Sequence, residues 1–234
     1  MIEEILPATV VSVETRGDIE DAALFPAERL TVDRAVPKRR REFATGRACA
    51  RDALAQLQVE RYPIPRGARG EPLWPAGIVG SITHCEGYRA AAVARASAVL
   101  SVGIDAEPHE PLPDGVLEAI AAEDERAWIA RLCHSTPAVH WDRLLFCAKE
   151  AVYKTWFPLT HSWLGFEDAH VEVDVAASTF VATLLVSAPA VEAPLDVLRG
   201  RWLVRDGLVL AAIALAAPPV PATARKVESA RTPT

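Results

Sequence analysis

The sequence predicts an α/β protein of the α+β kind, folded as two lobes. Its 234 residues are many for one compact domain but suit two small lobes that share an interface. Helix-like and strand-like patterns occur in both halves, and the proline-rich segment 107–113 between them is stiff enough to be a linker. We therefore expect an N-terminal lobe (residues 1–107), a C-terminal lobe (108–217) and a disordered tail (218–234).

The N-terminal half predicts one long helix, one loop and two strands. The helix covers Pro37–Leu57, because proline suits the first helical position and apolar residues then recur at helical spacing. Dense Pro and Gly residues indicate a loop over Tyr62–Gly80. Apolar runs on either side of Ser97 predict buried strands over Ala90–Arg95 and Val99–Ala106.

The C-terminal half begins with helical patterns and ends with strands. Helical stretches are expected over Val116–Leu132 and Val139–Trp156. The turn dipeptide Asp206-Gly207 predicts a hairpin between the last two strands. The expected strands are His170–Val175, Thr179–Val186, Leu198–Val204 and Leu208–Leu215.

Composition is typical of a soluble, cytoplasmic protein, with 50% apolar and 24% charged residues. No apolar run approaches the roughly 20 residues that a membrane-spanning helix needs. The N-terminus carries the acids Glu3 and Glu4 and lacks the basic region of a signal peptide. The four cysteines show no CxxC pairing, so we expect reduced thiols, with no zinc site and no disulfide framework.

Charge is unevenly distributed along the chain. The segment 34–69 holds ten Lys or Arg and three Asp or Glu, a net charge of +7 in a chain of net charge −6. A basic region in an acidic protein indicates an anionic ligand or partner. Nucleic acid is disfavoured because no aromatic residues are interleaved with the basic ones. A solvated basic helix face is the simpler interpretation, and composition alone favours it.

Two carboxylates follow the strand-like run that begins at Val99. Asp105 and Glu107 are two residues apart, so in a strand they share one face. Like charges beside apolar neighbours are costly unless a cation neutralises them, and an oxygen-rich pair suits Mg²⁺. A strand end whose acids simply meet solvent is at least as well supported by this motif alone.

The segment Phe146–Phe157 places both signs of charge on one side of a predicted helix. Lys149, Glu150, Tyr153 and Lys154 cluster there, opposite an apolar face. Such a side could supply a third carboxylate for a metal ion and two lysines for phosphates. The alternative is a surface ion pair between Glu150 and Lys154, four residues apart on the helix.

The segment Gly70–His84 combines glycines with polar side chains. Glycines allow backbone amides to approach an anion, and Ser81, Thr83 and His84 add side-chain donors. The spacing is not that of a Walker P-loop, and His84 fits no zinc-ligand pattern. A structural hydrogen-bonding role for His84 is the more frequent case for a lone histidine.

Together these segments resemble the 4′-phosphopantetheinyl transferases of the surfactin-synthetase-activating type, in particular their actinobacterial branch. The resemblance covers roughly residues 30–215. Phe146 stands where the family has tryptophan or phenylalanine, and Arg66 where many members have lysine. The three family motifs correspond in order to Gly70–His84, Gly103–Glu107 and Lys149–Lys154.

The resemblance implies two similar α/β lobes related by pseudo-twofold symmetry, with coenzyme A and a metal ion between them. It implies an enzyme that transfers 4′-phosphopantetheine from coenzyme A to a serine of acyl or peptidyl carrier proteins, releasing 3′,5′-ADP. Such enzymes serve fatty acid, polyketide and nonribosomal peptide biosynthesis. The resemblance also implies a monomer, with no nucleic-acid or membrane partner.

The resemblance also assigns roles to individual residues. Mg²⁺, or Mn²⁺, would be held by Asp105, Glu107 and Glu150, with Glu150 also the candidate base. Lys149 and Lys154 would face the pyrophosphate and act in catalysis, while Tyr153 and Trp163 would line the pantetheine path, although Trp163 could equally be a core aromatic. The remaining residues expected to contact coenzyme A are Arg39, Arg40, Arg47, Arg66, Gly70, Glu71, Ser81, Thr83, His84 and Asp105.

Two other functions remain open at this point. A non-catalytic module that binds coenzyme A or carrier proteins would lack a metal carboxylate or a phosphate lysine, and this chain has all of them. A magnesium-dependent hydrolase of coenzyme A or a nucleotide would need a group that positions water. No motif here suggests such a group.

Overall fold

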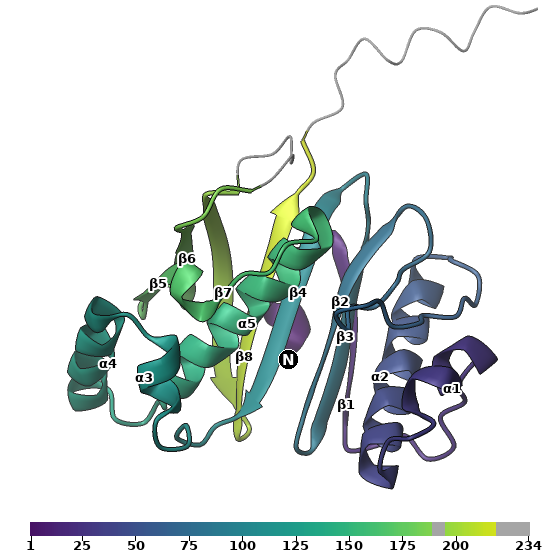
Figure 1. Ribbon diagram of the computed structural model, residues 1–234, viewed down its shortest axis with the longest axis horizontal. Coiled ribbons are helices and arrows are strands. Elements are labelled where there is room, and N and C mark those ends of the chain that lie inside the picture. Colours follow the sequence, from purple (N-terminus) through teal and green to yellow (C-terminus); the bar gives the residue numbers. More distant parts are fainter. Residues whose placement is uncertain (189–194, 219–234) are drawn as a thin grey trace, which may run out of the picture.

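The structure, a computed structural model, describes residues 1–188 and 195–218. Two antiparallel sheets pack against each other, and each carries a long helix on its outer face (Figure 1). The first sheet has the strand order β1-β3-β2 and the second β4-β8-β7-β6-β5. The strands are β1 (Val10–Arg16), β2 (Ile78–Cys85), β3 (Tyr88–Arg95), β4 (Val99–Pro108), β5 (Ala169–Asp174), β6 (Thr179–Leu184), β7 (Val197–Arg205) and β8 (Leu208–Ala216).

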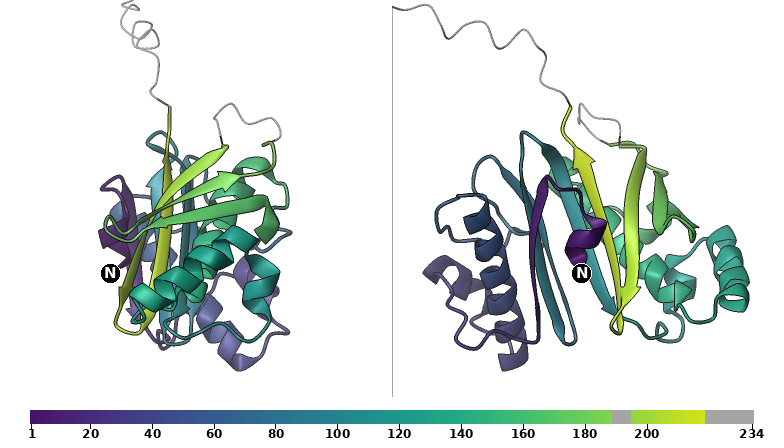
Figure 2. Two further views of the ribbon diagram at one scale, coloured as in Figure 1. Left: turned by 90° about the vertical axis from the view of Figure 1, so that its left-hand side faces the viewer. Right: turned by 180° about the vertical axis from the view of Figure 1, so that it is seen from behind.

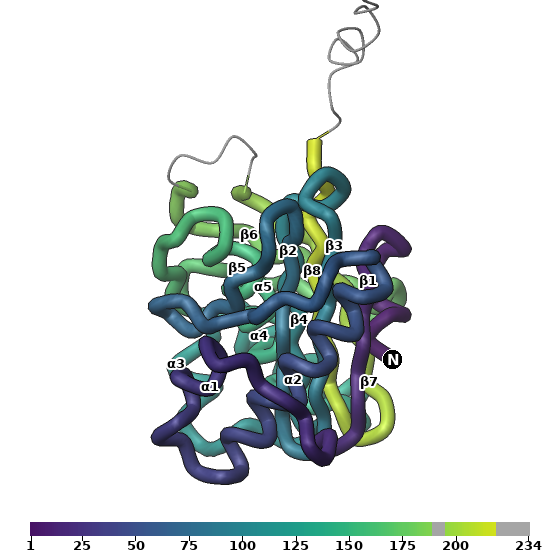
Figure 3. Tube along the Cα trace, turned by 90° about the vertical axis from the view of Figure 1, so that its right-hand side faces the viewer, coloured from purple at the N-terminus to yellow at the C-terminus, as the bar shows by residue number. Residues whose placement is uncertain are grey.

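The helices cover the outer faces and one end of the molecule. The 20-residue helix α2 packs on the first sheet and the 20-residue helix α5 on the second. From the side that it covers, α2 lies in front of the strands (Figure 3). The helices are η1 (Ile2–Ile5), α1 (Pro26–Val32), α2 (Pro37–Gln56), α3 (Val116–Ile120), α4 (Glu123–Ser135), α5 (Trp141–Thr160) and η2 (Phe166–Asp168).

Strand alternation explains the layers. On β3, Ala91 and Val93 face α2, whereas Ala90 and Ala92 face the second sheet. Leu210 on β8 packs in that same inter-sheet core, and successive strand residues point to opposite faces. The short helix η1 packs at the back of this core, against β1 and the second sheet (Figure 2, right). All four layers therefore share nearly continuous apolar contact.

Side-chain hydroxyls connect the two sheets at a place where their neighbouring strands form no backbone hydrogen bonds. Strands β2 and β4 run side by side in the same direction, but they belong to different sheets. The amide of Ile104 donates to Ser81 Oγ, and the amide of Ala106 donates to Thr83 Oγ1, each at 3.1 Å. Both hydroxyls are buried. They satisfy β4 amides that would otherwise be unpaired in the interior.

Helix α5 approaches β4 unusually closely at Gly103. A Cβ on Gly103 would lie 2.1 Å from the carbonyl oxygen of Ala151 and 2.3 Å from Thr155 Oγ1. Beside this contact, Ser101 Oγ donates to the carbonyl of Thr155 at 2.8 Å. Glycine is therefore required for the helix and the strand to bring their polar residues together.

Most predicted elements are confirmed, as is the α/β fold class. The long helix at Pro37, both strands around Ser97, and the Asp206-Gly207 hairpin are present. The predicted helix over Val116–Leu132 is instead two helices, α3 and α4, separated at residues 121–122. The predicted loop ends early, because β2 begins at Ile78; β1 and α1 had not been predicted.

The predicted division into residues 1–107 and 108–217 remains a prediction. Strand β4 precedes that boundary, yet it pairs with β8 in the second sheet. The tail beyond residue 218 lies outside the described residues.

Candidate active site

Asp105 lies at the centre of the site, on the face of β4 that meets α5. Its Oδ1 accepts hydrogen bonds from Thr83 Oγ1 at 3.0 Å and Lys154 Nζ at 2.6 Å. Its Oδ2 is buried and has no hydrogen-bond partner. A buried carboxylate oxygen without a partner is costly, and a cation bound beside it would offset that cost.

Glu107 follows on the same face of β4, as the strand spacing predicts. Arg143 Nη1 donates to its Oε2 at 2.9 Å, and the same guanidinium also binds the carbonyls of Glu110 and Pro111. Burial and the charge of Asp105 raise the pKa of Glu107 to about 6. A second charge is therefore held near Asp105 at a cost that a cation would offset.

Glu150 approaches from α5, one turn before Lys154. Burial, and then the charge of Asp105, raise the pKa of its carboxyl. Within residues 1–188 and 195–218, no three His, Cys, Asp or Glu side chains gather closely enough to hold a metal ion. The predicted trio is therefore not preassembled, because Lys154 binds Asp105 and Arg143 binds Glu107. The all-oxygen donor set and the free Asp105 Oδ2 nevertheless fit a hard cation such as Mg²⁺.

A cavity of about 190 Å³ opens between α5, β2 and the loop that carries Arg66, and of the three carboxylates only Glu150 lines it. Two smaller hollows adjoin it and share lining residues with it, so the three form one groove. One end holds Arg39 and His84, and the other holds Trp163. Glu150 and Lys154 line the middle.

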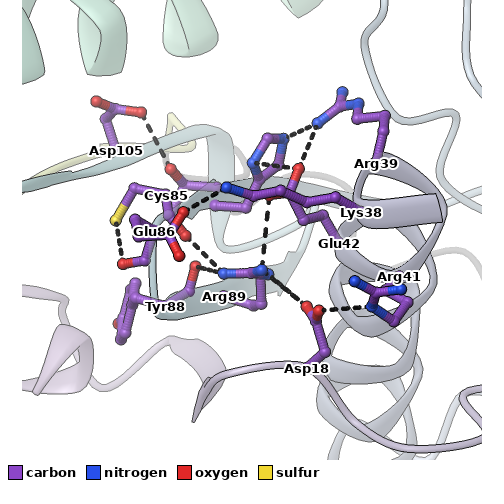
Figure 4. Close-up of polar contacts among 12 residues, drawn as sticks. Asp18, Lys38, Arg39, Arg41, Glu42, Cys85, Glu86, Tyr88, Arg89 and Asp105 are labelled. Carbon is purple, nitrogen blue, oxygen red and sulfur yellow. Dashed lines mark hydrogen bonds and ion pairs between the residues drawn. The ribbon is translucent and has the colours of Figure 1, made fainter. Parts of the chain in front are cut away.

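An ion-pair network holds the basic end of the groove (Figure 4). Arg39 Nη1 contacts His84 Nε2, and Glu42 Oε2 lies 3.8 Å from His84 Nδ1. Arginine can only donate, so Nε2 accepts and the imidazole proton lies on Nδ1, toward Glu42. Burial, and then the charge of Arg39, lower the pKa of His84 to about 4. His84 is therefore neutral at physiological pH.

Arg89 and Asp18 extend this network away from the groove. Arg89 Nη2 lies 2.7 Å from Asp18 Oδ1 and 3.7 Å from Glu42 Oε1, and Arg89 is buried. Arg41 pairs with Asp18 at 3.4 Å. Glu42 is thus an acceptor shared by Arg39 and Arg89, while Asp18 is shared by Arg41 and Arg89.

The predicted arginines divide into those that reach the groove and those that do not. Arg47 is buried, donates to the carbonyl of Ile64 at 2.8 Å and lies over the Phe43 ring. Burial lowers the pKa of Arg47 to about 10. Arg40 instead donates to the carbonyl of Ala35 and lies outside the groove, which leaves Arg39 as the better candidate of the pair.

Arg66 lines both the central cavity and the basic hollow. Gly70 has φ +102°, and a Cβ there would lie 2.5 Å from Arg66 Nη2, so glycine leaves room for this guanidinium. Glu71 lines the cavity and accepts from the amide of Arg69. Thr83 is not the free donor that was predicted, because its hydroxyl donates to Asp105. Ser81 only accepts, from the amide of Ile104, and it lines the central cavity.

Lys149 lines the hollow that holds Trp163, but its ammonium is buried rather than free for the pyrophosphate. It is 3% exposed, and its ammonium donates to Glu125 Oε2 and to the carbonyls of Ile120 and Phe166. Burial lowers its pKa, whereas Glu125 opposes this. These contacts leave no ammonium proton for a phosphate in this arrangement.

Tyr153 and Trp163 do meet at the far end of the groove. Their ring centroids lie 5.3 Å apart, and both line the hollow there. Trp163 is 67% exposed, which contradicts the alternative that it is a core aromatic. The two rings, tilted by 59° to each other, offer apolar faces to an extended ligand.

Sequence reasoning missed several charged residues that organise the site. Two of them, Glu28 and Glu125, are fully buried and occupy the third position of a helix, where each carboxylate caps the first turn. A glutamate three residues after the N-cap of each helix is the sequence pattern that could have identified them. The others are Glu42, Arg89 and Arg143, for which no sequence pattern was evident.

No helix in the described part of the chain is long and apolar enough to cross a membrane.

Comparisons with known proteins agree along most of the chain. Residues 27–94 match the family model of the 4′-phosphopantetheinyl transferase N-terminal domain, and residues 101–197 match that of the 4′-phosphopantetheinyl transferase superfamily. The chain is 52% identical over 222 residues to 4′-phosphopantetheinyl transferase Svp of Streptomyces mobaraensis (93% of this chain, 90% of the relative).

Two further relatives extend the comparison. 4′-Phosphopantetheinyl transferase PptT of Mycobacterium tuberculosis is 52% identical over 224 residues (92% of this chain, 98% of the relative). Enterobactin synthase component D of Salmonella typhimurium is 31% identical over 175 residues (74% and 70%). The chain therefore belongs to the 4′-phosphopantetheinyl transferase superfamily, whose members move the phosphopantetheine group of coenzyme A onto carrier proteins.

Proposed function

We propose that this enzyme carries out the transfer in the groove between β2, the Arg66 loop and α5, in a ternary complex of coenzyme A and an acyl or peptidyl carrier protein. The observation that carries the assignment is Asp105, a buried carboxylate. Its Oδ2 has no hydrogen-bond partner, and its Oδ1 binds Lys154, which lines the central cavity. We also propose that the enzyme acts as a cytoplasmic monomer, without nucleic-acid or membrane partners, in fatty acid, polyketide or nonribosomal peptide biosynthesis.

Coenzyme A would lie along the groove with its ends in opposite hollows. The 3′-phosphate and adenosine suit the end with Arg39, Arg47 and Arg66, because these cations gather there. The pyrophosphate then lies near Lys154 in the central cavity. The pantetheine arm extends toward Tyr153 and Trp163.

His84 supports this orientation indirectly. A neutral imidazole whose proton is on Nδ1 cannot donate from Nε2 to a phosphate. Its contact with Arg39 instead orients a guanidinium that can bind phosphate in two-point fashion.

The metal would be held by Asp105 and Glu150, with Glu107 beside them. We propose Mg²⁺, or Mn²⁺, because all the donors are oxygens. When bound, the ion would neutralise part of the pyrophosphate charge.

The transfer itself is one displacement at phosphorus. The oxygen of the carrier serine attacks the β-phosphorus, and the bond to the 3′,5′-ADP oxygen breaks, so that 3′,5′-ADP leaves with the bonding electrons. Glu150 takes the serine proton, and its raised pKa suits this role. Lys154 stabilises charge on the phosphoryl oxygens.

Exposed residues of the basic segment 34–69 would bind the carrier protein. Arg40 is exposed and lies outside the groove, which makes it a candidate for docking rather than for cofactor binding. Charge pairing of this kind mainly raises the association rate.

Intact-mass spectrometry tests the proposal. An apo acyl carrier protein incubated with the enzyme, coenzyme A and Mg²⁺ should gain the mass of one phosphopantetheine, and EDTA or mutation of the carrier serine should abolish the gain. Glu150→Gln should lose the activity, while Glu172→Gln, an exposed glutamate on β5, should retain it. Binding of coenzyme A without transfer to any carrier would instead indicate a binding module.

A further inference from the structure

The buried ion pair between Lys149 and Glu125 has no part in the chemistry proposed above. Lys149 Nζ lies 2.7 Å from Glu125 Oε2, and the side chains are 2% and 0% exposed. A buried pair replaced by apolar residues often costs nothing in stability, so stability alone does not explain its presence. The hydrogen bonds of the pair indicate a role in holding neighbouring elements in place.

The hydrogen bonds of both partners connect separate elements, and those of Lys149 use all three of its ammonium protons. The lysine on α5 also donates to the carbonyl of Ile120 at 2.7 Å and to that of Phe166 at 2.9 Å. The glutamate accepts from the amide of Ala122 at 2.8 Å and from that of Val171 at 2.7 Å. The pair therefore links α3, α4, α5, η2 and the beginning of β5.

Phe166 connects this pair to the groove. It begins η2 and belongs to the wall, residues 163–169, that lines the hollow opposite the arginines. Its ring packs 5.8 Å from that of Phe146 on α5. The opposite wall carries Glu150 and Tyr153 from α5 itself. Lys149 thus holds the two walls of this hollow at a fixed separation.

We propose that Lys149 and Glu125 are positioning residues that shape the end of the groove receiving the pantetheine arm, and that neither touches the phosphates of coenzyme A. This inference rests on the proposed function. Without the pair, the 163–169 wall loses its anchor to α5, and the arm loses an ordered surface. The arginine end is held by other residues and stays intact.

A ligand pair separates this role from the phosphate contact that the sequence predicts. Adenosine 3′-phosphate 5′-diphosphate carries the same three phosphoryl groups as coenzyme A but lacks the pantetheine arm. A residue that binds phosphate affects both ligands, whereas a residue that shapes the arm's hollow affects only coenzyme A. Isothermal titration calorimetry with Mg²⁺ measures both affinities on the intact enzyme.

For Lys149→Met, the dissociation constant of coenzyme A should rise roughly tenfold, as expected for a binding surface that must be ordered again. That of the nucleotide should stay within about twofold of wild type. Lys154→Met serves as the matched control and should weaken both ligands together. Equal weakening of both ligands by Lys149→Met would overturn the inference and restore a phosphate contact.

Lys149→Met leaves an unpaired carboxylate in the interior, so it could unfold the protein. The double variant Lys149→Met/Glu125→Gln removes the pair without leaving a buried charge. Its single amide oxygen keeps one of the two backbone bonds, because Ala122 and Val171 donate to different oxygens of the Glu125 carboxylate. A double variant that folds and binds coenzyme A with unchanged affinity would also refute the inference. If wild type binds neither ligand, the proposed function fails; if only the selectivity is absent, the inference alone fails.

Discussion

Gly103→Ala tests whether the close approach of α5 to β4 is needed for the active site. The added Cβ would lie 2.1 Å from the Ala151 carbonyl oxygen, 2.3 Å from Thr155 Oγ1 and 2.8 Å from the Thr155 amide nitrogen. Two of these atoms belong to the helix backbone, so no side-chain rotation relieves the contact. The helix must retreat from the strand by roughly 1 Å, because packed interiors transmit strain.

The expected loss of stability is about 2–3 kcal/mol, the range for an overpacked core. The loss of activity should be larger than stability explains. Glu150 and Lys154 flank Ala151 and Thr155 on α5, and Asp105 lies two residues from Gly103 on β4. Displacement of catalytic groups by ~1 Å can cost on the order of a hundredfold in rate.

Urea unfolding gives the change in stability, and carrier loading followed by mass spectrometry gives kcat on the folded fraction. Gly87→Ala is the matched control, since its Cβ would meet nothing within 4 Å and only its positive φ of +70° is strained. The control should lose about 1 kcal/mol and no activity. Wild-type stability together with wild-type kcat in Gly103→Ala would refute the reasoning.

Three further predictions concern the groove. His84→Gln should flatten the pH dependence of the free energy of unfolding. In the wild-type protein, His84 takes up a proton near pH 6.5 when unfolded but only near pH 4 when folded. Stability is therefore lost as the pH falls through this window. The difference between pH 7 and 4.5 should be roughly 1 kcal/mol after discounting for the part-exposed ring, and an unchanged profile in urea titrations would contradict it. Thr83→Val should cost about 1–3 kcal/mol in urea unfolding, since it leaves the buried Ala106 amide without an acceptor, whereas Thr15→Val, at the surface, should be nearly neutral. Trp163→Ala should keep the stability of wild type within about 0.5 kcal/mol but raise KM for coenzyme A, and a large fall in melting temperature would show instead a structural role.

Local patterns predicted the secondary structure well, because the spacing of apolar residues that distinguishes a helix from a strand is visible within a short stretch of sequence. Alternation also placed Asp105 and Glu107 on one face of β4 correctly. Lys149 shows the limit of this reasoning: its position on the polar side of α5 was clear, but its partner Glu125 lies 24 residues away and comes from another helix.

The arginines of α2 illustrate the same limit. Arg39 and Arg40 differ by one helical step, and only tertiary packing shows that Arg39 faces the groove. Arg51 belongs to the same basic segment, yet it is buried and pairs with buried Glu28 at 3.0 Å. Charge density along the sequence therefore predicted a basic region without separating its structural from its functional members.

The pairing of β4 with β8 has a consequence for synthesis on the ribosome. Residues up to Arg95 contain every strand of the first sheet and the helix that covers it. The only ladder partner of β4 in the described structure is β8, which begins at Leu208 and is therefore translated about a hundred residues later. Asp105 and Glu107 consequently lie on a strand without a backbone partner until residues 208–216 have emerged. The nascent chain can thus build its arginine-lined half early, but it acquires its acidic half only after β8 has been synthesised.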